Sequence, residues 1–330
     1  MKRVIVFGAG LVVRAHVRCL LDHGCHVTVA SRTVAKAEAI LDGHPLGTPI
    51  AFDIEREPER LESLVAEHDL AVSLLPWVHH PAVAKACLAR GKHMVTTSYV
   101  KDEMKALDGA AKKAGVVLLN ELGVDPGIDH MTAMKVIHAV QAAGGEITSF
   151  QSYCGGLPAP EANDNPFGYK FSWSPRGVIL AGLNDARYRR DGREVRVPGA
   201  ELFDHQWQVP VEVEGRLTSF IGYPNRDSLP YTEYYGIDPE DTMFRGTLRF
   251  PHWCAAIKQM ARLGWLGTAE LDDLEGKTFA DLTARLAGLK STRGLAAAVA
   301  GTLGIDAAGP AISCMEWIGL FSSDPLPRPN

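Results

Sequence analysis

Short runs of consecutive apolar residues alternate with longer mixed stretches along the first third of the chain. The runs that we predict to be strands are RVIVFGAG (3–10), HVTVASR (26–32), PIAFDI (49–54), DLAVSLLP (69–76), HMVTTS (93–98) and VVLLNEL (116–122). The stretches that we predict to be helices are residues 11–23, 33–41, 57–67, 79–90 and 101–114. Because the strands are continuously apolar, we expect a parallel sheet covered by helices on both faces. This alternation is typical of the doubly wound α/β class.

The pattern changes after residue 125, where we place a domain boundary. We predict a helix over 128–140 and a strand over 147–153 that begins the second domain. The run SYCGGLPAPEANDNPFGYKFSWSPRG (152–177) is too irregular for a plain helix or strand, and we expect a loop that Pro175 closes. The predicted fold is therefore an N-terminal Rossmann doubly wound parallel sheet (1–125) plus a mixed α/β substrate domain (126–330). A helical subdomain is expected near 252–310.

Composition and charge exclude several classes of protein. The chain has 330 residues, of which 46% are hydrophobic and 22% charged, as is ordinary for a soluble enzyme. A net charge of -5 argues against a general nucleic-acid or membrane-surface binder. The six cysteines are scattered and form no CxxC pair, which suits a reducing compartment. We therefore expect a cytoplasmic protein with a small-molecule substrate and no nucleic-acid or membrane partner.

A glycine-rich turn follows the first predicted strand. Gly8 permits a tight turn, and Gly10 lets a pyrophosphate approach the backbone at the start of the next helix. Val13 stands where the usual third glycine would be, but the position between a strand and a helix supports a dinucleotide site. The contacts predicted from this turn are Gly8, Gly10, Leu11, Val12 and Val13.

The end of the second predicted strand favours NADP(H) over NAD(H). The chain has Ser31, Arg32 and Thr33 there, with no carboxylate to repel a 2′-phosphate, and Arg32 offers a planar cationic fork. The alternative is that Arg32 is a solvated surface residue. Asp53 either accepts from the adenine amine or caps the next turn. The remaining predicted cofactor contacts are Ile54, Leu75, Pro76 and Thr97.

Two polar side chains fall at the carboxyl ends of later strands, where ligands bind in such folds. Tyr99 follows the fifth strand and Asp125 follows the sixth, on a corner stiffened by Pro126. The alternatives are a half-buried aromatic residue for Tyr99 and a helix N-cap for Asp125. The histidines do not have the spacing of a metal site, and we expect ordinary structural roles for them and no metal.

Several longer runs carry a family resemblance. HMVTTSYV, NELGVDPGIDH, SYCGGLPAPEANDNPFGYKFSWSPRGV, GYPNRDS and MFRGTLRF, with WIGLFSSD near the end, extend in this order over nearly the whole chain. With these runs the sequence resembles the saccharopine reductases, the glutamate-forming saccharopine dehydrogenases of lysine metabolism. The resemblance implies an NADP-dependent oxidoreductase acting on CH–NH groups. Such an enzyme reduces the imine of α-aminoadipate semialdehyde and glutamate to saccharopine.

The resemblance also implies which side chains form the site. Tyr99 and Asp125 match proton-handling or orienting groups, and Cys154 matches a pocket-lining thiol, with an inert buried cysteine as the alternative. Lys170 is a rival acid or base. Saccharopine carries three carboxylates, which arginines recognise in a bidentate manner, and Phe171 with Trp173 would exclude water. The predicted substrate contacts are Ser98, Tyr99, Asp125, Trp173, Arg226, Arg245, Gly246 and Thr247.

Two further functions stay open, and the position of WIGLFSSD bears on the second. Chains of the family continue well past this motif, so we expect that the present sequence lacks the family's C-terminal portion, and that a homodimer partner covers the apolar surface left. The proline-rich residues 324–330 are expected to form neither a helix nor a central strand. One alternative function is a reductase of another amine–aldehyde imine, such as carboxynorspermidine. The other is a catalytically silent NADP-binding protein.

Overall fold

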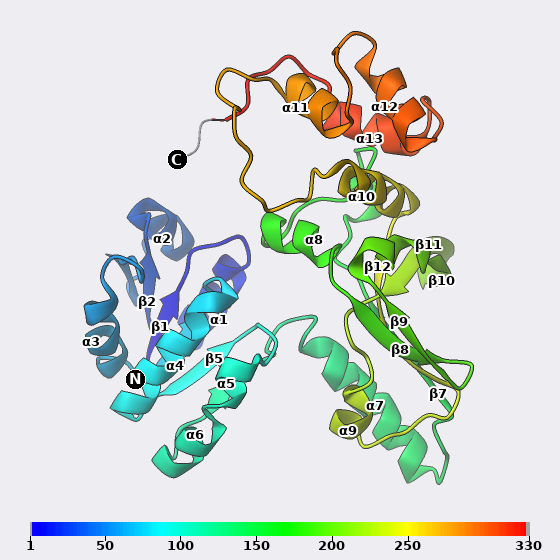
Figure 1. Cartoon of the computed structure of the whole chain (residues 1–330). Coiled ribbons are helices and arrows are strands. Elements are labelled where there is room, and N and C mark those ends of the chain that lie inside the picture. The colour runs from blue at the N-terminus through cyan, green and yellow to red at the C-terminus, as the bar shows by residue number, and fades with distance from the viewer. Residues whose placement is uncertain (1, 328–330) are drawn as a thin grey trace. The chain divides into compact units, whose positions relative to one another are not determined.

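The computed structural model describes residues 2–327, which divide into two compact units (Figure 1). The first unit runs to Val136 and includes Ser172–Ser174, and the second comprises Ile137–Phe171 and the chain from Pro175 onward. The first unit thus extends past residue 125 into the first half of the helix that follows. Within residues 2–327, no helix is both long enough and apolar enough to cross a membrane.

The first unit is built on a six-stranded parallel sheet in the order β3-β2-β1-β4-β5-β6. Its strands are β1 (Arg3–Phe7), β2 (His26–Ser31), β3 (Gly47–Ala51), β4 (Leu70–Ser73), β5 (His93–Thr96) and β6 (Leu118–Leu119). Its helices are α1 (Val13–Asp22), α2 (Val34–Leu41), η1 (Pro58–Arg60), α3 (Leu61–Ala66), η2 (Trp77–His79), α4 (His80–Arg90), α5 (Asp102–Lys105) and α6 (Asp108–Ala114). The predicted Rossmann sheet is confirmed, with every strand in the expected place.

Both faces of this sheet are buried, which explains the continuous apolar runs. In β1, Val4 and Val6 pack with α1 and α2 in one core cluster. Ile5 and Phe7 point to the other face and pack with α3 and α4 in a second cluster. Successive side chains of a strand alternate between faces, so a strand covered on both sides needs apolar residues at every position.

One local prediction needs correction. The stretch 101–114 was expected as one helix, but it forms two short helices interrupted at residues 106–107, because helix propensities alone do not fix where a helix ends. Pro175 closes the loop that precedes it, as predicted. It is the first residue of α8 (Pro175–Ala181), a position that suits proline because the first helical N–H has no intrahelical partner.

The second unit contains a mixed sheet in the order β10-β11-β12-β8-β9, with β7 pairing in parallel to β12. Its strands are β7 (Ser149–Cys154), β8 (Ala186–Arg190), β9 (Arg193–Val197), β10 (Trp207–Val213), β11 (Arg216–Pro224) and β12 (Thr242–Arg249). The helices before and among them are α7 (Ile128–Ala142), which spans the division between the units, η3 (Pro160–Ala162), α8, η4 (Gly199–Asp204) and α9 (Tyr231–Tyr235). The predicted mixed α/β character is confirmed.

The last part of the second unit is helical, as predicted, and its helices gather at one end of that unit in Figure 1. They are α10 (Pro251–Leu263), α11 (Phe279–Leu286), α12 (Leu295–Leu303) and α13 (Pro310–Trp317), the last of which was not predicted. Their buried faces share one core with Phe244 of β12. Pro325, in the proline-rich end, forms an isolated bridge with Thr278, and residues 328–330 lie outside the described residues.

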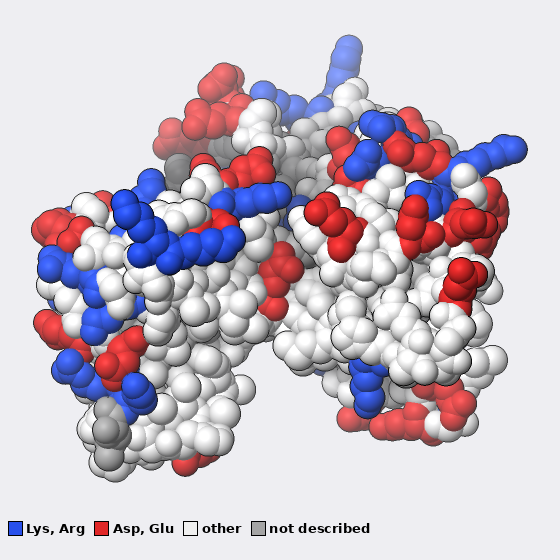
Figure 2. All heavy atoms as spheres, turned by 90° about the horizontal axis from the view of Figure 1, so that it is seen from below, with Lys and Arg blue, Asp and Glu red and all other residues white. Residues whose placement is uncertain are grey.

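Charge is mixed over the face of the molecule shown in Figure 2. Basic and acidic side chains lie next to one another there, and wide areas carry neither. Such interspersed charge agrees with the small net charge of the chain.

Candidate functional site

The glycine-rich turn after β1 fits a dinucleotide pyrophosphate. Gly8 has φ +116°, and a Cβ on it would lie 2.9 Å from the carbonyl oxygen of Leu74, so only glycine is accommodated there. Gly10 differs, because a Cβ on it would meet nothing within 4 Å. Packing therefore does not require a glycine at position 10, and a glycine there leaves room for a ligand close to the backbone.

The start of α1 completes this cradle. No side chain caps the helix, and its first turn holds no acidic residue, so its N–H groups and its positive dipole end suit an anion. Leu11 and Val12 are exposed at 66% and 49%, whereas the Val13 side chain is fully buried and its N–H donates to Gly10. Of the residues predicted in this turn, Val13 is thus the one whose side chain serves the core.

The residues predicted to bind the 2′-phosphate lie at the end of β2. Arg32 and Thr33 are exposed, and the N–H of Thr33 donates to the hydroxyl of Ser31 at 3.2 Å. Arg32 forms no ion pair with any residue between 2 and 327. A guanidinium without a carboxylate partner, beside hydroxyl groups, fits a 2′-phosphate.

The other predicted cofactor residues lie at the same carboxyl edge of the sheet. Asp53 Oδ1 accepts from the N–H of Glu55 at 3.0 Å, which is the turn-capping arrangement weighed as an alternative. The remaining four follow the ends of β3, β4 and β5 and are half-buried apart from the exposed Pro76; they are Ile54, Leu75, Pro76 and Thr97.

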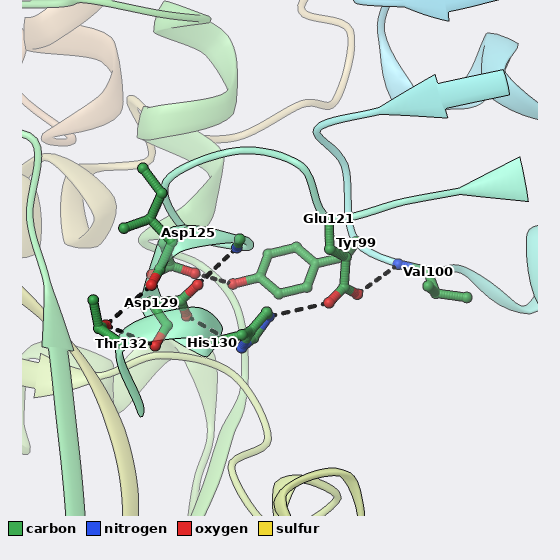
Figure 3. Close-up of polar contacts among 9 residues, drawn as sticks. Tyr99, Val100, Glu121, Asp125, Asp129, His130 and Thr132 are labelled. Atoms are coloured by element: carbon green, nitrogen blue, oxygen red, sulfur yellow. Dashed lines mark hydrogen bonds and ion pairs between the residues drawn. The ribbon is translucent and has the colours of Figure 1, made fainter. Parts of the chain in front are cut away.

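Tyr99 and Asp125, which are 26 positions apart in the sequence, meet in the first unit. The phenol of Tyr99 donates to Asp125 Oδ1 at 2.5 Å, and both side chains are half-buried (Figure 3). A phenol that donates to one carboxylate oxygen orients the whole carboxylate, and this pair is the centre of the candidate site.

Asp125 sits on a tightly closed corner. The N–H of Gly123 donates to Pro126 O at 2.9 Å, and the N–H of Ile128 donates back to Gly123 O at 3.0 Å. A Cβ on Gly127 would lie 2.1 Å from Gly123 O, so a glycine is required at that position. The bond between Asp125 and Pro126 is cis. The corner therefore fixes the position from which the Asp125 side chain projects.

Two carboxylates and an imidazole lie beside this pair. Glu121 Oε2 is 3.1 Å from His130 Nε2, and His130 Nδ1 is 3.6 Å from Asp129 Oδ2 (Figure 3). Asp129 is only 9% exposed, and its other oxygen accepts from the N–H of Gly127 at 2.7 Å. Among residues 2–327, no group of three or more His, Cys, Asp or Glu side chains is arranged to hold a metal ion.

The hydroxyl of Ser98 is hydrogen-bonded to the buried ring of His80. His80 is 2% exposed, and its Nδ1 lies 2.8 Å from the Ser73 hydroxyl. Its Nε2 lies 2.8 Å from the Ser98 hydroxyl and 3.1 Å from that of Thr96. Each hydroxyl can donate or accept, so the neutral ring is fully satisfied. Desolvation by burial lowers the pKa of His80 to about 4.

This buried imidazole is expected to make folding sensitive to acid. The pKa of His80 falls from 6.5 to about 4 on folding, so between these values the unfolded chain binds the extra proton. Stability contributed by the neutral ring is therefore lost as the pH falls, by about 2 kcal/mol between pH 7 and pH 4.5. Urea unfolding at both pH values, with His80→Asn for comparison, measures it. An equal pH dependence of the two proteins would contradict the prediction.

In the second unit, Arg226 and Arg245 belong to neighbouring segments. The N–H of Asn225 donates to Arg245 O at 2.9 Å, which places the turn after β11 beside β12. Arg226 is exposed and has a left-handed φ of 57°. The adjacent Asp227 is bound by Arg187, with a distance of 2.7 Å to Nη2. The carboxylate of Asp227 is therefore bound by Arg187.

Arg245 is the more buried of the two, with 3% of its surface exposed. Its guanidinium lies 4.1 Å from the ring centroid of Tyr231, and the backbone N–H of Arg245 donates to the Ser228 hydroxyl at 2.9 Å. A Cβ on Gly246 would meet the Phe244 ring at 2.4 Å. Thr247 hydrogen-bonds with the phenol of Tyr223, whose pKa burial raises to about 12.

The irregular loop carries fewer side chains suited to acid–base chemistry than predicted. Cys154 is the half-buried last residue of β7, opposite Thr247 of β12. Lys170 is exposed and pairs with Asp164 at 2.9 Å, so the rival acid or base is a surface ion pair. Phe171 and Trp173 are 45% and 43% exposed, and Phe171 packs edge-on against Tyr169.

Sequence reasoning missed Glu121, Asp129 and the roles of His80 and His130. Glu121 and Asp129 lie within the NELGVDPGIDH run, on either side of Asp125. Proximity to that corner was the available signal, but a single carboxylate in a loop has many ordinary uses. The contact between Glu121 and His130 depends on the reversal of the chain at residues 123–128.

Comparison with known proteins gives matches over both units. The family profile of the saccharopine dehydrogenase NADP binding domain matches residues 4–119, and that of the saccharopine dehydrogenase C-terminal domain matches residues 123–327. The chain is 41% identical over its whole length to "Saccharopine dehydrogenase [NADP(+), L-glutamate-forming]" of Pyricularia oryzae and covers 74% of that protein.

Two further relatives extend the comparison. The mitochondrial alpha-aminoadipic semialdehyde synthase of Bos taurus is 38% identical over 99% of the chain, which covers 36% of that longer protein. The solved structure of apo saccharopine dehydrogenase (L-Glu forming) from Saccharomyces cerevisiae superposes with a TM-score of 0.81 at 35% identity. That match covers 98% of this chain and 73% of the yeast chain.

Proposed function

The chain belongs to the saccharopine dehydrogenase family, and on that premise we propose that it is an NADP-dependent, L-glutamate-forming enzyme acting on CH–NH bonds. It interconverts saccharopine with glutamate and α-aminoadipate semialdehyde, a step of lysine metabolism. Whole-length identity to the fungal enzyme supports the reaction. The structural observation that supports it most directly is the Tyr99–Asp125 hydrogen bond at the carboxyl edge of a sheet whose first turn fits NADP.

The reaction makes three demands on the protein. Glutamate's amine condenses with the aldehyde, water leaves, and the imine carbon gains a hydride while its nitrogen gains a proton. NADPH supplies the hydride when bound, held by the Gly8–Gly10 turn, the start of α1 and Arg32. The chain must therefore orient the nitrogen, manage its proton and neutralise three carboxylates.

We assign the first demand, orientation of the nitrogen, to Tyr99 and Asp125. The phenol fixes the orientation of the Asp125 carboxylate, which we propose to accept a hydrogen bond from the ammonium of glutamate or from the secondary amine of saccharopine. The carboxylate would then stabilise positive charge at that nitrogen. Its role is mainly orientation, with proton exchange through solvent or substrate.

Arg226 and Arg245 are proposed to bind substrate carboxylates. Both are arginines, which form two parallel hydrogen bonds to a carboxylate where lysine forms one. Burial of Arg245 against Tyr231 fixes its guanidinium, which lowers the entropy lost on binding. The hydroxyl of Ser98, supported by His80, is proposed as a further donor to the substrate.

The proposal is tested by following NADPH oxidation with α-aminoadipate semialdehyde and glutamate. Turnover that requires both substrates, with NADPH strongly preferred over NADH, is the expected result. Binding of NADPH without oxidation would instead favour the silent nucleotide-binding protein. Oxidation only with another amine and aldehyde pair, such as those that give carboxynorspermidine, would favour the other imine reductase.

The Tyr99–Asp125 pair is expected to act as a unit. Tyr99→Phe and Asp125→Asn should each lower kcat/KM by about tenfold. Tyr99→Phe removes the hydroxyl that orients the Asp125 carboxylate, and Asp125→Asn replaces that carboxylate with an amide. The double variant should lose little more than each single one, since both changes remove one interaction. Steady-state kinetics of the three variants, with the exposed Asp108→Asn on α6 as control, measures this. Losses that multiply in the double variant would contradict it.

The cytoplasm is proposed as the compartment. All six cysteines are free thiols, which a reducing environment maintains. Burial raises the pKa of Cys87 and Cys254 to about 12 and that of Cys314 to about 11, so these thiols stay protonated and unreactive. The homodimer stays a prediction, which size-exclusion chromatography with light scattering would test.

A further inference from the structure

Glu121 occupies a backbone conformation that its residue type does not favour. Its φ is +64°, in the left-handed region, where glycine and asparagine are at ease and a longer side chain is strained. Residues held in this way persist where the surroundings over-determine them, and they cluster at functional sites. The left-handed backbone therefore indicates that the Glu121 side chain makes contacts that a glycine could not make.

The two oxygens of the Glu121 carboxylate hold two different segments. Oε1 accepts from the N–H of Val100 at 3.0 Å, directly after Tyr99, and Oε2 accepts from Nε2 of His130 at 3.1 Å (Figure 3). Because a carboxylate only accepts, Nε2 is the protonated nitrogen. The N–H of Glu121 also donates to Ser98 O at 3.1 Å. Glu121 therefore contacts the residue before Tyr99 and the residue after it.

His130 links Glu121 to the Asp125 corner. It lies in the first turn of α7, and the N–H of His130 donates to Gly127 O at 3.0 Å. Its neighbour Asp129 accepts from the N–H of Gly127, the residue that closes the corner. A single chain of contacts therefore runs from Val100 through Glu121 and His130 to the loop that carries Asp125.

We propose that Glu121 is a positioning residue that joins the Tyr99 segment to the Asp125 corner through His130 and so keeps the phenol against the carboxylate. The inference rests on the proposed function of the Tyr99–Asp125 pair. Glu121 does not act on substrate itself in this scheme. Its contribution is to hold a 2.5 Å hydrogen bond between side chains from two separate loops.

Glu121→Gly is the decisive variant, because it removes both carboxylate contacts and relieves the left-handed backbone. Two results are expected. The amide of Val100 loses its protection in hydrogen exchange followed by mass spectrometry of the 97–105 segment. kcat/KM falls about tenfold in the wild-type background but less than twofold in the Tyr99→Phe background, because Glu121 acts through that phenol.

Matched variants separate positioning from general support of the fold. Asp42→Gly makes the same backbone change at another left-handed residue of the first unit, with φ 52°, and should leave kcat/KM unchanged. Glu121→Gln keeps one oxygen acceptor but replaces the second with an amide donor, so its kcat/KM should lie between that of Glu121→Gly and that of wild type. His130→Leu should reproduce the kinetic loss of Glu121→Gly.

Three outcomes would overturn the proposal. They are unchanged protection of Val100 in Glu121→Gly, an equal kinetic loss with and without the Tyr99 hydroxyl, and a fall in unfolding midpoint with unchanged kcat/KM. If the wild-type protein does not turn over saccharopine, the proposed function fails. The exchange measurement on Val100 still decides whether Glu121 holds the segment.

Discussion

Replacing Arg226 with alanine is expected to raise the KM for saccharopine about 100-fold, while the KM for NADP changes less than about threefold. Truncating one partner of a hydrogen-bonded charge pair commonly costs about 2–5 kcal/mol, and a 100-fold change corresponds to about 2.7 kcal/mol. The loss is expected in substrate KM rather than kcat, because a carboxylate distant from the imine is bound equally before and during hydride transfer.

The local structure explains why Arg226 is chosen over its neighbours. Arg187 binds the neighbouring Asp227 through Nε at 3.0 Å and Nη2 at 2.7 Å, which holds the segment that carries Arg226 in place. The backbone of Arg226 is fixed in turn, because its carbonyl accepts from the N–H of Arg187 at 3.0 Å. An exposed guanidinium on a fixed backbone is suited to capture an anion.

The controls for Arg226 test geometry as well as charge. Arg226→Lys keeps the charge but not the planar fork, and it should raise the KM about tenfold. Arg216→Ala removes another exposed arginine from the same unit, at the start of β11, and should change nothing. A KM for saccharopine within threefold of wild type in Arg226→Ala would remove Arg226 from the substrate site.

The fold of the first unit could be read from periodicity because burial on both faces leaves a strong sequence signal. Strands β1 and β4 are buried at all but one position and β2 at half of its positions, and such short apolar runs between glycine turns favour strands of a covered parallel sheet. The break between α5 and α6 left a weaker signal. Helix propensities differ by less than about 1 kcal/mol per residue there, so packing decides where a helix ends.

The candidate site divides in the same way. Tyr99 and Asp125 were predictable because topology alone brings the carboxyl ends of parallel strands to one edge. Glu121 was not, since its left-handed backbone runs against the preference of its residue type and its partners come from a reversal of the chain. His80 was equally hidden. A histidine after a strand has no pattern that separates a solvated ring from one that bridges three hydroxyls.

Coenzyme selectivity is expected to depend on Arg32 as strongly as substrate binding depends on Arg226. Arg32→Ala should raise the KM for NADPH about 50-fold and leave the KM for NADH within about twofold, because only NADPH carries the 2′-phosphate. The exposed guanidinium forms no ion pair with residues 2–327, so its removal leaves no buried charge and folding should be unaffected. Initial rates with each coenzyme at saturating substrates measure the effect.

The reverse change sharpens the test of the same site. Ser31→Asp places a carboxylate where NAD enzymes carry one, so it should repel the 2′-phosphate of NADPH and accept a hydrogen bond from the ribose 2′-hydroxyl of NADH. Combined with Arg32→Ala, it should shift the ratio of kcat/KM values toward NADH by about 1,000-fold, or about 4 kcal/mol. Arg90→Ala, an exposed arginine at the end of α4, is the control. Equal losses for NADPH and NADH would place the phosphate elsewhere, because a residue that touches only the 2′ position cannot weaken the coenzyme that lacks it.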